Sequence, residues 1–471
     1  MTWAKLWTSS TQTKVGTTDN ALTSRTLEGR DAFISTQPPQ RKMRAIIALC
    51  AMVVAAVQAE AGSQLWRVEA PSYHRVVRAL EDDGDVDVWA GTADHCKVLV
   101  EGSASTRVVR ALAEADIGHS VEVEDMMALV EQERTHMQER RRKRAAQPMD
   151  WTSYHDMDDI EGFIGWLNST GGDLVQVASP TRSVEGREVL VLRINDPSSQ
   201  GVKKKKIWIE GGIHAREWIS PAVSTFLMYQ LVTNPEWRDL LKVTEWYIVP
   251  VANPDGYQFS FSSQSARLWR KNRRDNGVSE RCKGVDLNRN WDFKWGVGAS
   301  ANPCSETYKG VNAFSEPETF GLQQMMRTIP DIDLFITFHS FGQTVLYPWG
   351  WTRNAPSNAM QLKRLAKAFT DTVKQTSLGK VDYDIGGSGP LYGLASGATD
   401  DWAYGELGIP FSYTIELPDQ GTHGFLLPEN RVSSTVIESA AGVHCMVSLL
   451  ANSGSCARRR TRNPSSIRFR G

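Results

Sequence analysis

Three side chains in this sequence have the types and the spacing of a metal site. His214 and Glu217 stand three residues apart, directly after a Gly-Gly pair that lets the backbone come close to an ion. His339 follows another apolar segment farther along the chain. A catalytic zinc ion takes three protein ligands and leaves a fourth position open, and two imidazoles with one carboxylate suit it. Each histidine alone would more often be a core or surface residue, and Glu217 a helix-start acid, but together the three indicate a zinc site.

Four apolar segments end close to polar side chains, and these segments predict the strands that position the site. They span 207–210, 246–251, 333–338 and 411–415. His214 and Asn253 follow the first two, and His339 and Glu416 come directly after the last two. Longer helical stretches separate the segments, which is typical of an α/β sheet. Because such sheets place ligands at the carboxyl ends of their strands, we expect these side chains to meet there.

The N-terminal region has the pattern of a secretory signal. Basic residues at 41–44 precede an apolar run at 45–57, and the small residues Ala59 and Ala61 follow it. The run is shorter than the roughly 20 apolar residues that span a bilayer. A signal peptide at 43–59, and therefore an extracellular protein with no stable membrane span, is favoured over a buried core helix. Residues 1–42 are polar and aperiodic, and we interpret them as a leader or a gene-model extension.

Charge divides the rest of the chain into segments. The 471 residues carry a formal net charge of -1, which gives no bulk attraction to nucleic acid. Residues 60–139 hold 17 acidic and 7 basic side chains and end in the basic run 140–144. That run could be a solvated charge cluster, but its place before a larger unit favours proteolytic processing. We therefore predict an activation prosegment at 60–144, a small α/β module with strands at 86–88 and 97–100 and a helix at 106–115.

The motifs of the larger unit, residues 145–456, resemble those of the secreted zinc metallocarboxypeptidases of the pancreatic carboxypeptidase A/B group. They are His214-Ala-Arg-Glu-Trp-Ile-Ser-Pro221, Asn253-Pro-Asp-Gly-Tyr257, Trp269-Arg-Lys271, Gly284-Val-Asp-Leu-Asn-Arg-Asn-Trp291 and Gly424-Phe-Leu-Leu-Pro428. The resemblance implies a mixed eight-stranded sheet flanked by helices, behind a small antiparallel α/β prodomain. It also implies one Zn2+ ion, because two histidines and a glutamate are the catalytic zinc ligands of carboxypeptidase A.

The resemblance implies a set of cationic side chains that recognise the end of a peptide. Arg289 with Asn288 matches the clamp for the terminal carboxylate, which a planar guanidinium binds through paired hydrogen bonds. Arg270 matches the residue that polarises the scissile carbonyl group. Arg216 would add a third cationic subsite. A surface ion pair for Arg289 and a general basic face around Arg270 are the alternatives.

Two further residues match the catalytic machinery of the family. Glu416 ends an apolar strand, and the resemblance implies a general base that takes a proton from water and delivers it to the leaving amine. A structural acid bound to an arginine is the alternative. Tyr392, in a glycine-rich stretch, matches the mobile tyrosine that closes over substrate.

The preferred substrate follows from Asp400, at the position where the family places the base of the side-chain pocket. An acid there favours C-terminal Lys or Arg, whereas an apolar residue favours aliphatic or aromatic ends. Gly350 and Gly387 leave room, and a helix-capping or strand-edge role for Asp400 is the alternative. The sequence departs from the family at Phe341 and Pro418, and the stretch from Tyr392 to Asp400 is one residue longer.

Six cysteines acquire meaning if the protein is exported, because disulfides persist outside the cell. Cys282 and Cys304 enclose a loop rich in Asn, Gly and Pro, and we expect them to be bridged. Cys445 and Cys456 are close enough in sequence to pair. Cys96 is then left over, and Cys50 lies in the presumed signal.

Three functions remain in competition. The favoured one is a secreted zinc exopeptidase, synthesised as an inactive zymogen, that removes single residues from peptide or protein C-termini. Its acidic prosegment would cover the cationic site until a trypsin-like or furin-like protease cleaves the chain at 140–144. The alternatives are a secreted peptide-binding pseudoenzyme and an intracellular relative acting on polypeptide tails. The arginine-rich tail at 457–471 has no family counterpart that we can place, and a disordered, surface-binding or removable segment is the simplest interpretation.

Overall fold

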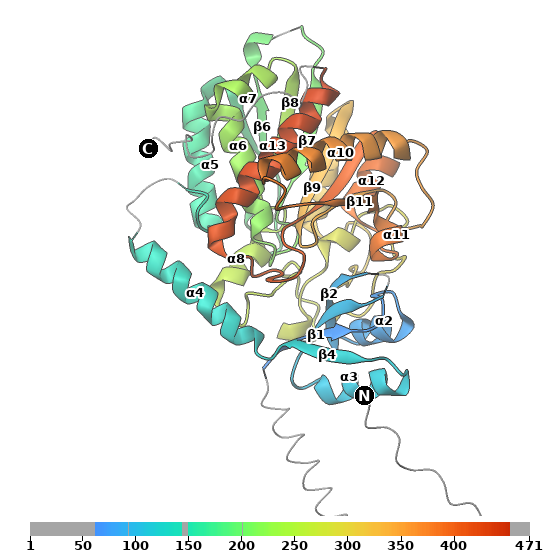
Figure 1. Ribbon diagram of the computed structural model, residues 1–471. Helices are drawn as coiled ribbons and strands as arrows, with labels where there is room; N and C mark the ends of the chain where they lie inside the picture. The colour runs from blue at the N-terminus through green and yellow to red at the C-terminus, as the bar shows by residue number, and fades with distance from the viewer. Residues whose placement is uncertain (1–61, 93, 144–148, 200, 453–471) are drawn as a thin grey trace, which may run out of the picture. The chain divides into compact units, whose positions relative to one another are not determined.

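The computed structural model describes residues 62–92, 94–143, 149–199 and 201–452, which form two β-sheets with their helices (Figure 1). The predicted leader, signal peptide and arginine-rich tail lie outside the described residues, as do the side chains of the basic run 140–144. Processing at that run and the boundaries at 42, 59, 144 and 456 therefore stay predictions.

The first sheet has four antiparallel strands in the order β2-β3-β1-β4. Its elements are β1 (Gln64–Val68), α2 (Arg75–Asp82), β2 (Val86–Gly91), β3 (Cys96–Val100), α3 (Ser105–Glu114) and β4 (His119–Val123). Side chains alternate across each strand, so Trp66 and Val68 pack with Val77 of α2 and Val108 of α3, whereas Leu65 lies in a different cluster. The predicted module of two strands and a helix is confirmed, with two more strands and one more helix.

A long helix, α4 (Met126–Lys143), follows the first sheet. Met126 and Val130 at its start are buried and pack with Leu65, Trp89 and Leu99. The two turns of α4 that carry these residues therefore belong to the packing of the first sheet.

The second sheet has eight strands in the order β11-β10-β12-β9-β7-β8-β6-β5. The strands are β5 (Val175–Arg182), β6 (Glu188–Asn195), β7 (Lys205–Glu210), β8 (Thr244–Val249), β9 (Ile332–Ser340), β10 (Thr344–Tyr347), β11 (Asp384–Gly387) and β12 (Phe411–Leu417). Parallel and antiparallel pairs both occur. The predicted mixed eight-stranded sheet is confirmed, and all four predicted strands are present with shifted ends.

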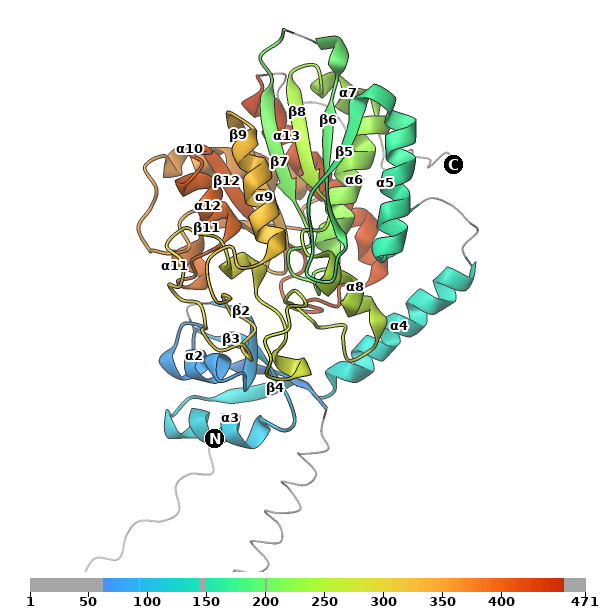
Figure 2. The same ribbon diagram turned by 180° about the vertical axis from the view of Figure 1, so that it is seen from behind.

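Helices cover both faces of this sheet (Figures 1 and 2). One face packs against α5 (Met157–Gly171), α6 (Ile219–Thr233), α10 (Ala359–Thr376) and α13 (Val432–Leu450). The other face packs against α9 (Pro317–Thr328) and α12 (Thr399–Gly405). The shorter helices are α7 (Pro235–Leu240), α8 (Pro254–Ser262) and α11 (Ser388–Tyr392). Because both faces are covered, the central strands β8 and β9 are buried along nearly their whole length rather than at alternate residues.

Four neighbouring strands, β12, β9, β7 and β8, run parallel and position the site. Their carboxyl ends share one edge of the sheet, so the segments that follow them meet there. The register between β9 and β12 pairs His339 directly with Glu416. Residues far apart in the sequence are thereby neighbours.

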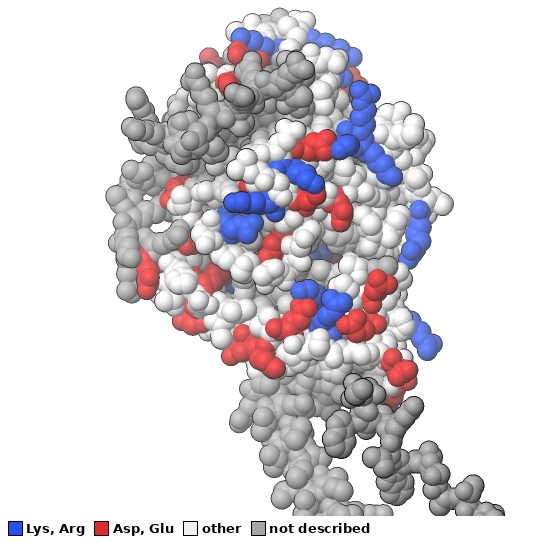
Figure 3. All heavy atoms as spheres, viewed as in Figure 1, with Lys and Arg blue, Asp and Glu red and all other residues white. Residues whose placement is uncertain are grey.

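One helix in the described part of the chain, within 429–450, has the length and composition of a membrane span, but 61% of that stretch is buried inside the protein. This is the position of α13 in the helical layer against the sheet. Lys, Arg, Asp and Glu side chains are interspersed on the face shown in Figure 3, which agrees with the near-zero net charge.

Candidate metal centre and active site

His214, Glu217 and His339 meet at the carboxyl edge of the second sheet, all three buried. The Nδ1 atom of His214 lies 2.8 Å from Oε1 of Glu217. The Nδ1 atom of His339 lies 3.1 Å from Nδ1 of His214 and 3.1 Å from Oε2 of Glu217. Gly212 has φ +63° in the turn before His214, and a Cβ there would lie 3.1 Å from the backbone of Val251, so glycine permits the close approach.

These distances fit a tetrahedral divalent cation. Zinc–nitrogen bonds are about 2.0–2.1 Å, so two ligand nitrogens on one zinc ion lie roughly 3.4 Å apart. The imidazole nitrogens of His214 and His339 lie 3.1 Å apart, close to that spacing. The three ligand atoms lie within 4.8 Å of one another. The donor set therefore suits zinc.

The outer ring nitrogen of His214 is held by a carboxylate that sequence reasoning missed. Nε2 of His214 lies 3.0 Å from Oδ1 of Asp286, which is fully buried. The positive charges of Arg270 and His214 overcome the effect of burial and hold the pKa of Asp286 well below its usual range. A carboxylate on the far nitrogen of a ligating histidine orients the ring and raises its basicity. Asp286 belongs to the motif at 284–291, which also contains Asn288 and Arg289. That position in the sequence could have indicated a role for Asp286 at the site.

The predicted recognition residues surround the same cavity. It has a volume of about 180 Å³, and Arg270, Asn288 and Arg289 line it together with the metal-site residues. Arg270 donates to Oδ2 of Asp286 over 2.9 Å. Arg289 donates from Nη1 to the carbonyl oxygen of Asn288 over 2.9 Å, and its buried Nε has no hydrogen-bond partner among the described residues. Arg289 therefore retains free donor capacity.

Arg216 is not among the residues that line this cavity, and its role as a third cationic subsite stays a prediction. Its guanidinium group is buried and donates to both carboxylate oxygens of Asp87, on β2 of the first sheet. The ring of Phe425 lies 4.2 Å from the guanidinium carbon. The charge of Arg216 is paired with a carboxylate from the first sheet. No local pattern in the sequence reveals this contact.

Glu416 and Tyr392 also line the cavity. Burial raises the pKa of Glu416 to about 8. No ion pair links Glu416 to an arginine in the part of the chain that the structure describes, so the structural alternative gains no support there. The Tyr392 hydroxyl group lies 3.1 Å from Oγ1 of Thr344. Both side chains are within reach of a molecule held in the cavity.

Asp400 stands in the first turn of α12 and faces the cavity. Its carboxylate is buried, and Oδ2 has no hydrogen-bond partner among the described residues. Burial raises the pKa of Asp400 above its usual value. Gly350 and Ser388 line the same cavity, whereas Gly387 is not among the lining residues. Ala398 is the N-cap residue of α12 and makes no side-chain cap hydrogen bond, so a capping role for Asp400 gains no support, whereas Asp400 does line the pocket.

The departures from the family pattern have local explanations. Phe341 packs with its ring centroid 5.0 Å from Phe425 and 6.3 Å from Trp89 of β2. An apolar ring in place of a hydroxyl-bearing one therefore joins a cluster shared by both sheets. Pro418 precedes Asp419, whose carboxylate accepts hydrogen bonds from backbone amides at Gly421 and Gly424. A basic side chain is not required to hold this turn.

The cysteines follow the expected pattern where they are described. Cys282 and Cys304 form a disulfide. Cys445 is also disulfide-bonded, and Cys456, its proposed partner, lies outside the described residues. Cys96 is a free thiol, and burial raises its pKa to about 12, so it is unreactive.

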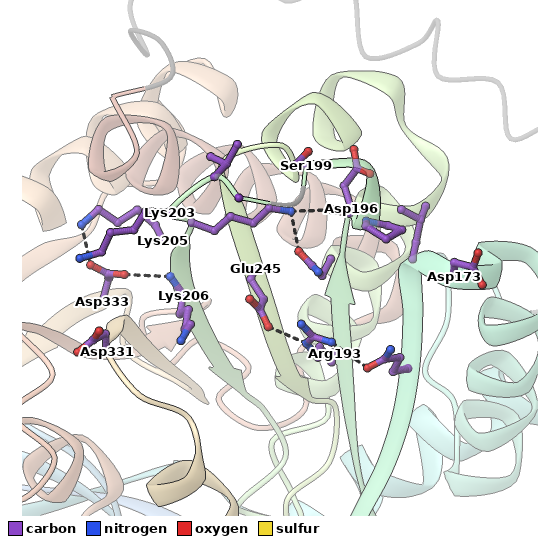
Figure 4. A pocket seen from close by; sticks show the side chains of 17 residues that line it. Asp173, Arg193, Asp196, Ser199, Lys203, Lys205, Lys206, Glu245, Asp331 and Asp333 are labelled. Atoms are coloured by element: carbon purple, nitrogen blue, oxygen red, sulfur yellow. Dashed lines mark hydrogen bonds and ion pairs between the residues drawn. The ribbon is translucent and has the colours of Figure 1, made fainter.

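A larger cavity of about 620 Å³ lies near the opposite end of β7 (Figure 4). Lys203–Lys206 and Arg193 line it with five acids: Asp173, Asp196, Glu245, Asp331 and Asp333. Lys205 pairs with Asp333 at 2.7 Å, and Arg193 pairs with Glu245 at 2.6 Å. Because the opposite charges are matched and no histidine is present among its lining residues, this cavity is no candidate for the metal chemistry.

Comparison with known proteins agrees with the site. Residues 160–442 match the zinc carboxypeptidase family. Carboxypeptidase B of Astacus astacus is 40% identical over 310 residues, which are 65% of this chain and 100% of the relative. Carboxypeptidase A1 of Bos taurus is 33% identical over 85% of this chain and 97% of its own. A crystal structure of carboxypeptidase A from Helicoverpa armigera superposes with a TM-score of 0.77 at 28% identity, covering 84% of this chain and 98% of that one.

The chain belongs to the zinc carboxypeptidase family. It is therefore a metallo-exopeptidase, a hydrolase that acts on peptides. The expected family and fold are confirmed, whereas relatives of both the A and the B kind are among the matches.

Proposed function

We propose that this protein is the zymogen of a secreted zinc carboxypeptidase that prefers C-terminal Lys and Arg. The observation that carries the preference is the buried Asp400 carboxylate, which faces the cavity with one oxygen unpartnered among the described residues. A buried carboxylate without a partner is costly, and a cationic side chain that entered the cavity would relieve that cost.

His214, Glu217 and His339 would hold the zinc ion, with Asp286 orienting His214. When bound, zinc supplies Lewis acidity, which polarises a carbonyl oxygen and lowers the pKa of a water molecule. The protein holds all three ligands on buried, well-packed segments, so the site is formed before substrate arrives.

The cationic residues would recognise the end of the peptide. Arg289, with its spare Nε donor, binds the terminal carboxylate beside Asn288. Arg270 stands at the same cavity with its guanidinium fixed by Asp286, so it can donate to the oxygen of the scissile carbonyl group as negative charge develops. Recognition of a free carboxylate restricts cleavage to the last peptide bond.

Glu416 would act as the proton carrier. It lines the cavity next to His339 in the register of β9 and β12. Its carboxylate accepts a proton from the attacking water and then donates that proton to the departing amine nitrogen. Tyr392 contributes a hydroxyl group that can contact bound substrate.

The first sheet would keep the enzyme inactive. Its residues Arg78, Glu81, Asp87 and Trp89 line the same cavity as the catalytic residues. A peptide that approached this cavity would meet β2, so removal of residues 60–144 would be required for full activity. The signal peptide at 43–59 supports export, and the basic run at 140–144 suits a trypsin-like or furin-like protease.

The preference for Lys and Arg competes with an alternative, because relatives of both the A and the B kind are among the matches. Several matched proteins are named as carboxypeptidases A, so a preference for aliphatic or aromatic ends is the second candidate. A peptide-binding pseudoenzyme is a weaker candidate, because it would have no need to retain both Glu416 and the complete ligand set.

The decisive experiment cleaves the purified zymogen at the basic run and assays peptides that differ only in a C-terminal Lys, Leu or Phe. We expect fastest release of Lys and complete inhibition by a chelator. Faster release of Leu or Phe would overturn the role of Asp400 while leaving the metal chemistry intact. No release from any peptide, in protein of full zinc content, would favour the pseudoenzyme.

A further inference from the structure

Asp401, the neighbour of Asp400, is buried and does not line the cavity. Its carboxylate accepts backbone hydrogen bonds from a turn between β10 and α10. The Gly350 amide donates to Oδ1 over 2.9 Å and to Oδ2 over 3.0 Å, and the Trp351 amide donates to Oδ2 over 3.0 Å. The turn is therefore held chiefly through Asp401 on this side.

The other side of the turn is held by the segment that precedes α12. The Ala395 amide donates to the carbonyl oxygen of Gly350 over 2.9 Å. A Cβ atom added to Gly350 would lie 2.5 Å from the carbonyl oxygen of Ala395 and 3.5 Å from Oδ2 of Asp401. Both Gly350 and Ala395 line the cavity. The turn thus forms part of the cavity wall, and it packs against Ala395 too closely to accept a methyl group at Gly350.

Aromatic packing joins the same turn to α12 a second time. The ring of Trp349 lies 4.8 Å from the ring of Tyr404, one helical turn beyond Asp401, and 5.3 Å from the ring of Phe293. The short helix α12 therefore has two roles. It presents the Asp400 carboxylate to the cavity, and it holds the Gly350 turn that forms part of the cavity wall. The charge of the pocket and the position of its wall are built on one element.

We infer that Asp401 is a positioning residue that fixes the Gly350 turn as a wall of the side-chain pocket, and so determines how long a C-terminal side chain the enzyme accepts. This inference rests on the proposed carboxypeptidase function. A side chain long enough to reach Asp400 must share the cavity with Gly350, whereas a methyl group need not extend that far. Displacement of the turn therefore penalises long side chains and spares short ones.

The test compares activated wild-type enzyme with Asp401→Asn on peptides ending in Lys, Leu and Ala. The Gly350 amide lies 2.9 Å and 3.0 Å from the two carboxylate oxygens, so in either orientation of an asparagine its NH2 group faces the Gly350 N–H and the turn is held less firmly. We expect kcat/KM to fall about 10- to 100-fold for Lys and Leu, mainly through KM, and less than about threefold for Ala. Glu406→Gln, an exposed change at the end of the same helix, serves as the matched control and should leave all three values unchanged.

If the ratios of kcat/KM among the three peptides are the same as in the wild type, the inference is overturned. An equal loss on all three would indicate a merely structural role for Asp401. If Asp401→Asn does not fold, Gly350→Ala decides, because its Cβ would push the same turn from the opposite side. Failure of the Lys preference is separate: it appears as faster release of Leu by the wild type. In that case the ratio of Leu to Ala still tests Asp401.

Discussion

Arg216 and Asp87 form a two-point ion pair between the two sheets of the protein. Both carboxylate oxygens of Asp87 accept from the guanidinium group, with 3.0 Å between Nη2 and Oδ1. Arg216 is 1% exposed, and Asp87 also accepts from the indole nitrogen of Trp89 over 2.7 Å. Breaking a buried pair leaves an unpaired buried charge, which costs about 3–5 kcal/mol. This contact is therefore a main determinant of how firmly the first sheet covers the cavity.

We predict that Asp87→Ala raises the activity of the uncleaved chain. Loss of the carboxylate leaves the Arg216 cation buried without its partner, so the first sheet separates from the site more often. Peptide hydrolysis by the uncleaved variant, compared with the uncleaved wild type, measures the effect. Asp94→Ala, an exposed change in the same module, should have no effect. An uncleaved Asp87→Ala chain as silent as the wild type would refute the inhibitory role of this pair.

Glu416→Gln should abolish turnover while preserving the fold. An amide cannot carry the proton, and loss of a general base typically lowers kcat by about 10²- to 10⁴-fold. Glutamine has nearly the same shape and volume as glutamate, so the packing around this position should be preserved. Steady-state kinetics with thermal unfolding checks both expectations. A kcat within tenfold of the wild type, in folded protein, would exclude Glu416 as the proton carrier.

Removal of the metal should stop activity reversibly, and Asp286→Asn should weaken metal binding. A chelator is expected to abolish peptide hydrolysis and added Zn2+ to restore it.

Because Asp286 holds Nε2 of His214 at 3.0 Å, its neutral variant should bind zinc about 10- to 100-fold more weakly. Competition with a metal-sensitive dye gives the affinity directly. Unchanged zinc affinity in Asp286→Asn would contradict the orienting role.

Asp400→Ala should exchange the substrate preference rather than lower all activity. Without the carboxylate, a peptide ending in Lys must bury an unpaired ammonium group, so its kcat/KM should fall about 100-fold or more. A peptide ending in Leu should be hydrolysed at least as fast as by the wild type. Ratios of kcat/KM for the two peptides measure the exchange. A parallel loss on both would mean that Asp400 serves the fold and not the pocket.

Glu318 predicts a pH dependence of stability away from the active site. Burial, with the nearby charge of Glu316, raises the pKa of Glu318 from 4.5 to about 7. The folded state therefore holds the proton more tightly than the unfolded chain. The resulting stabilisation is fully present below about pH 4.5 and is lost as the pH rises through about 7, on the order of 3 kcal/mol in total.

Glu318→Gln removes this titration and keeps an oxygen for the Val184 amide, which lies 3.2 Å from Oε1. The variant should therefore lose less stability than the wild type between pH 5 and pH 8. Denaturant unfolding at several pH values measures the difference, with the exposed change Glu131→Gln as control. Identical pH profiles for the wild type and Glu318→Gln would rule out the raised pKa.

Much of the fold could be predicted from local patterns. The segments that end in His339 or Glu416 are rich in apolar residues because both faces of their strands are covered, and such segments are visible in any sequence. Strand ends shifted, since β9 runs to Ser340 and includes His339 itself. The mixed eight-stranded sheet was implied only by resemblance, and the order of its strands was not predicted, because pairing across the sheet depends on contacts between distant segments.

The candidate zinc ligands, the candidate proton carrier and the candidate recognition arginines could be named from the sequence, because each chemistry requires a particular side-chain type within a short spaced motif. The amino-acid sequence by itself thus determined the family, the sheet and the candidate ligands.

Only the tertiary structure decided that Arg216 pairs with Asp87 instead of lining the cavity, that Asp286 holds His214, and that Asp401 anchors the Gly350 turn. The physical reason is that charge pairing and backbone hydrogen bonding act over a few ångströms in space, whereas a sequence records only distance along the chain.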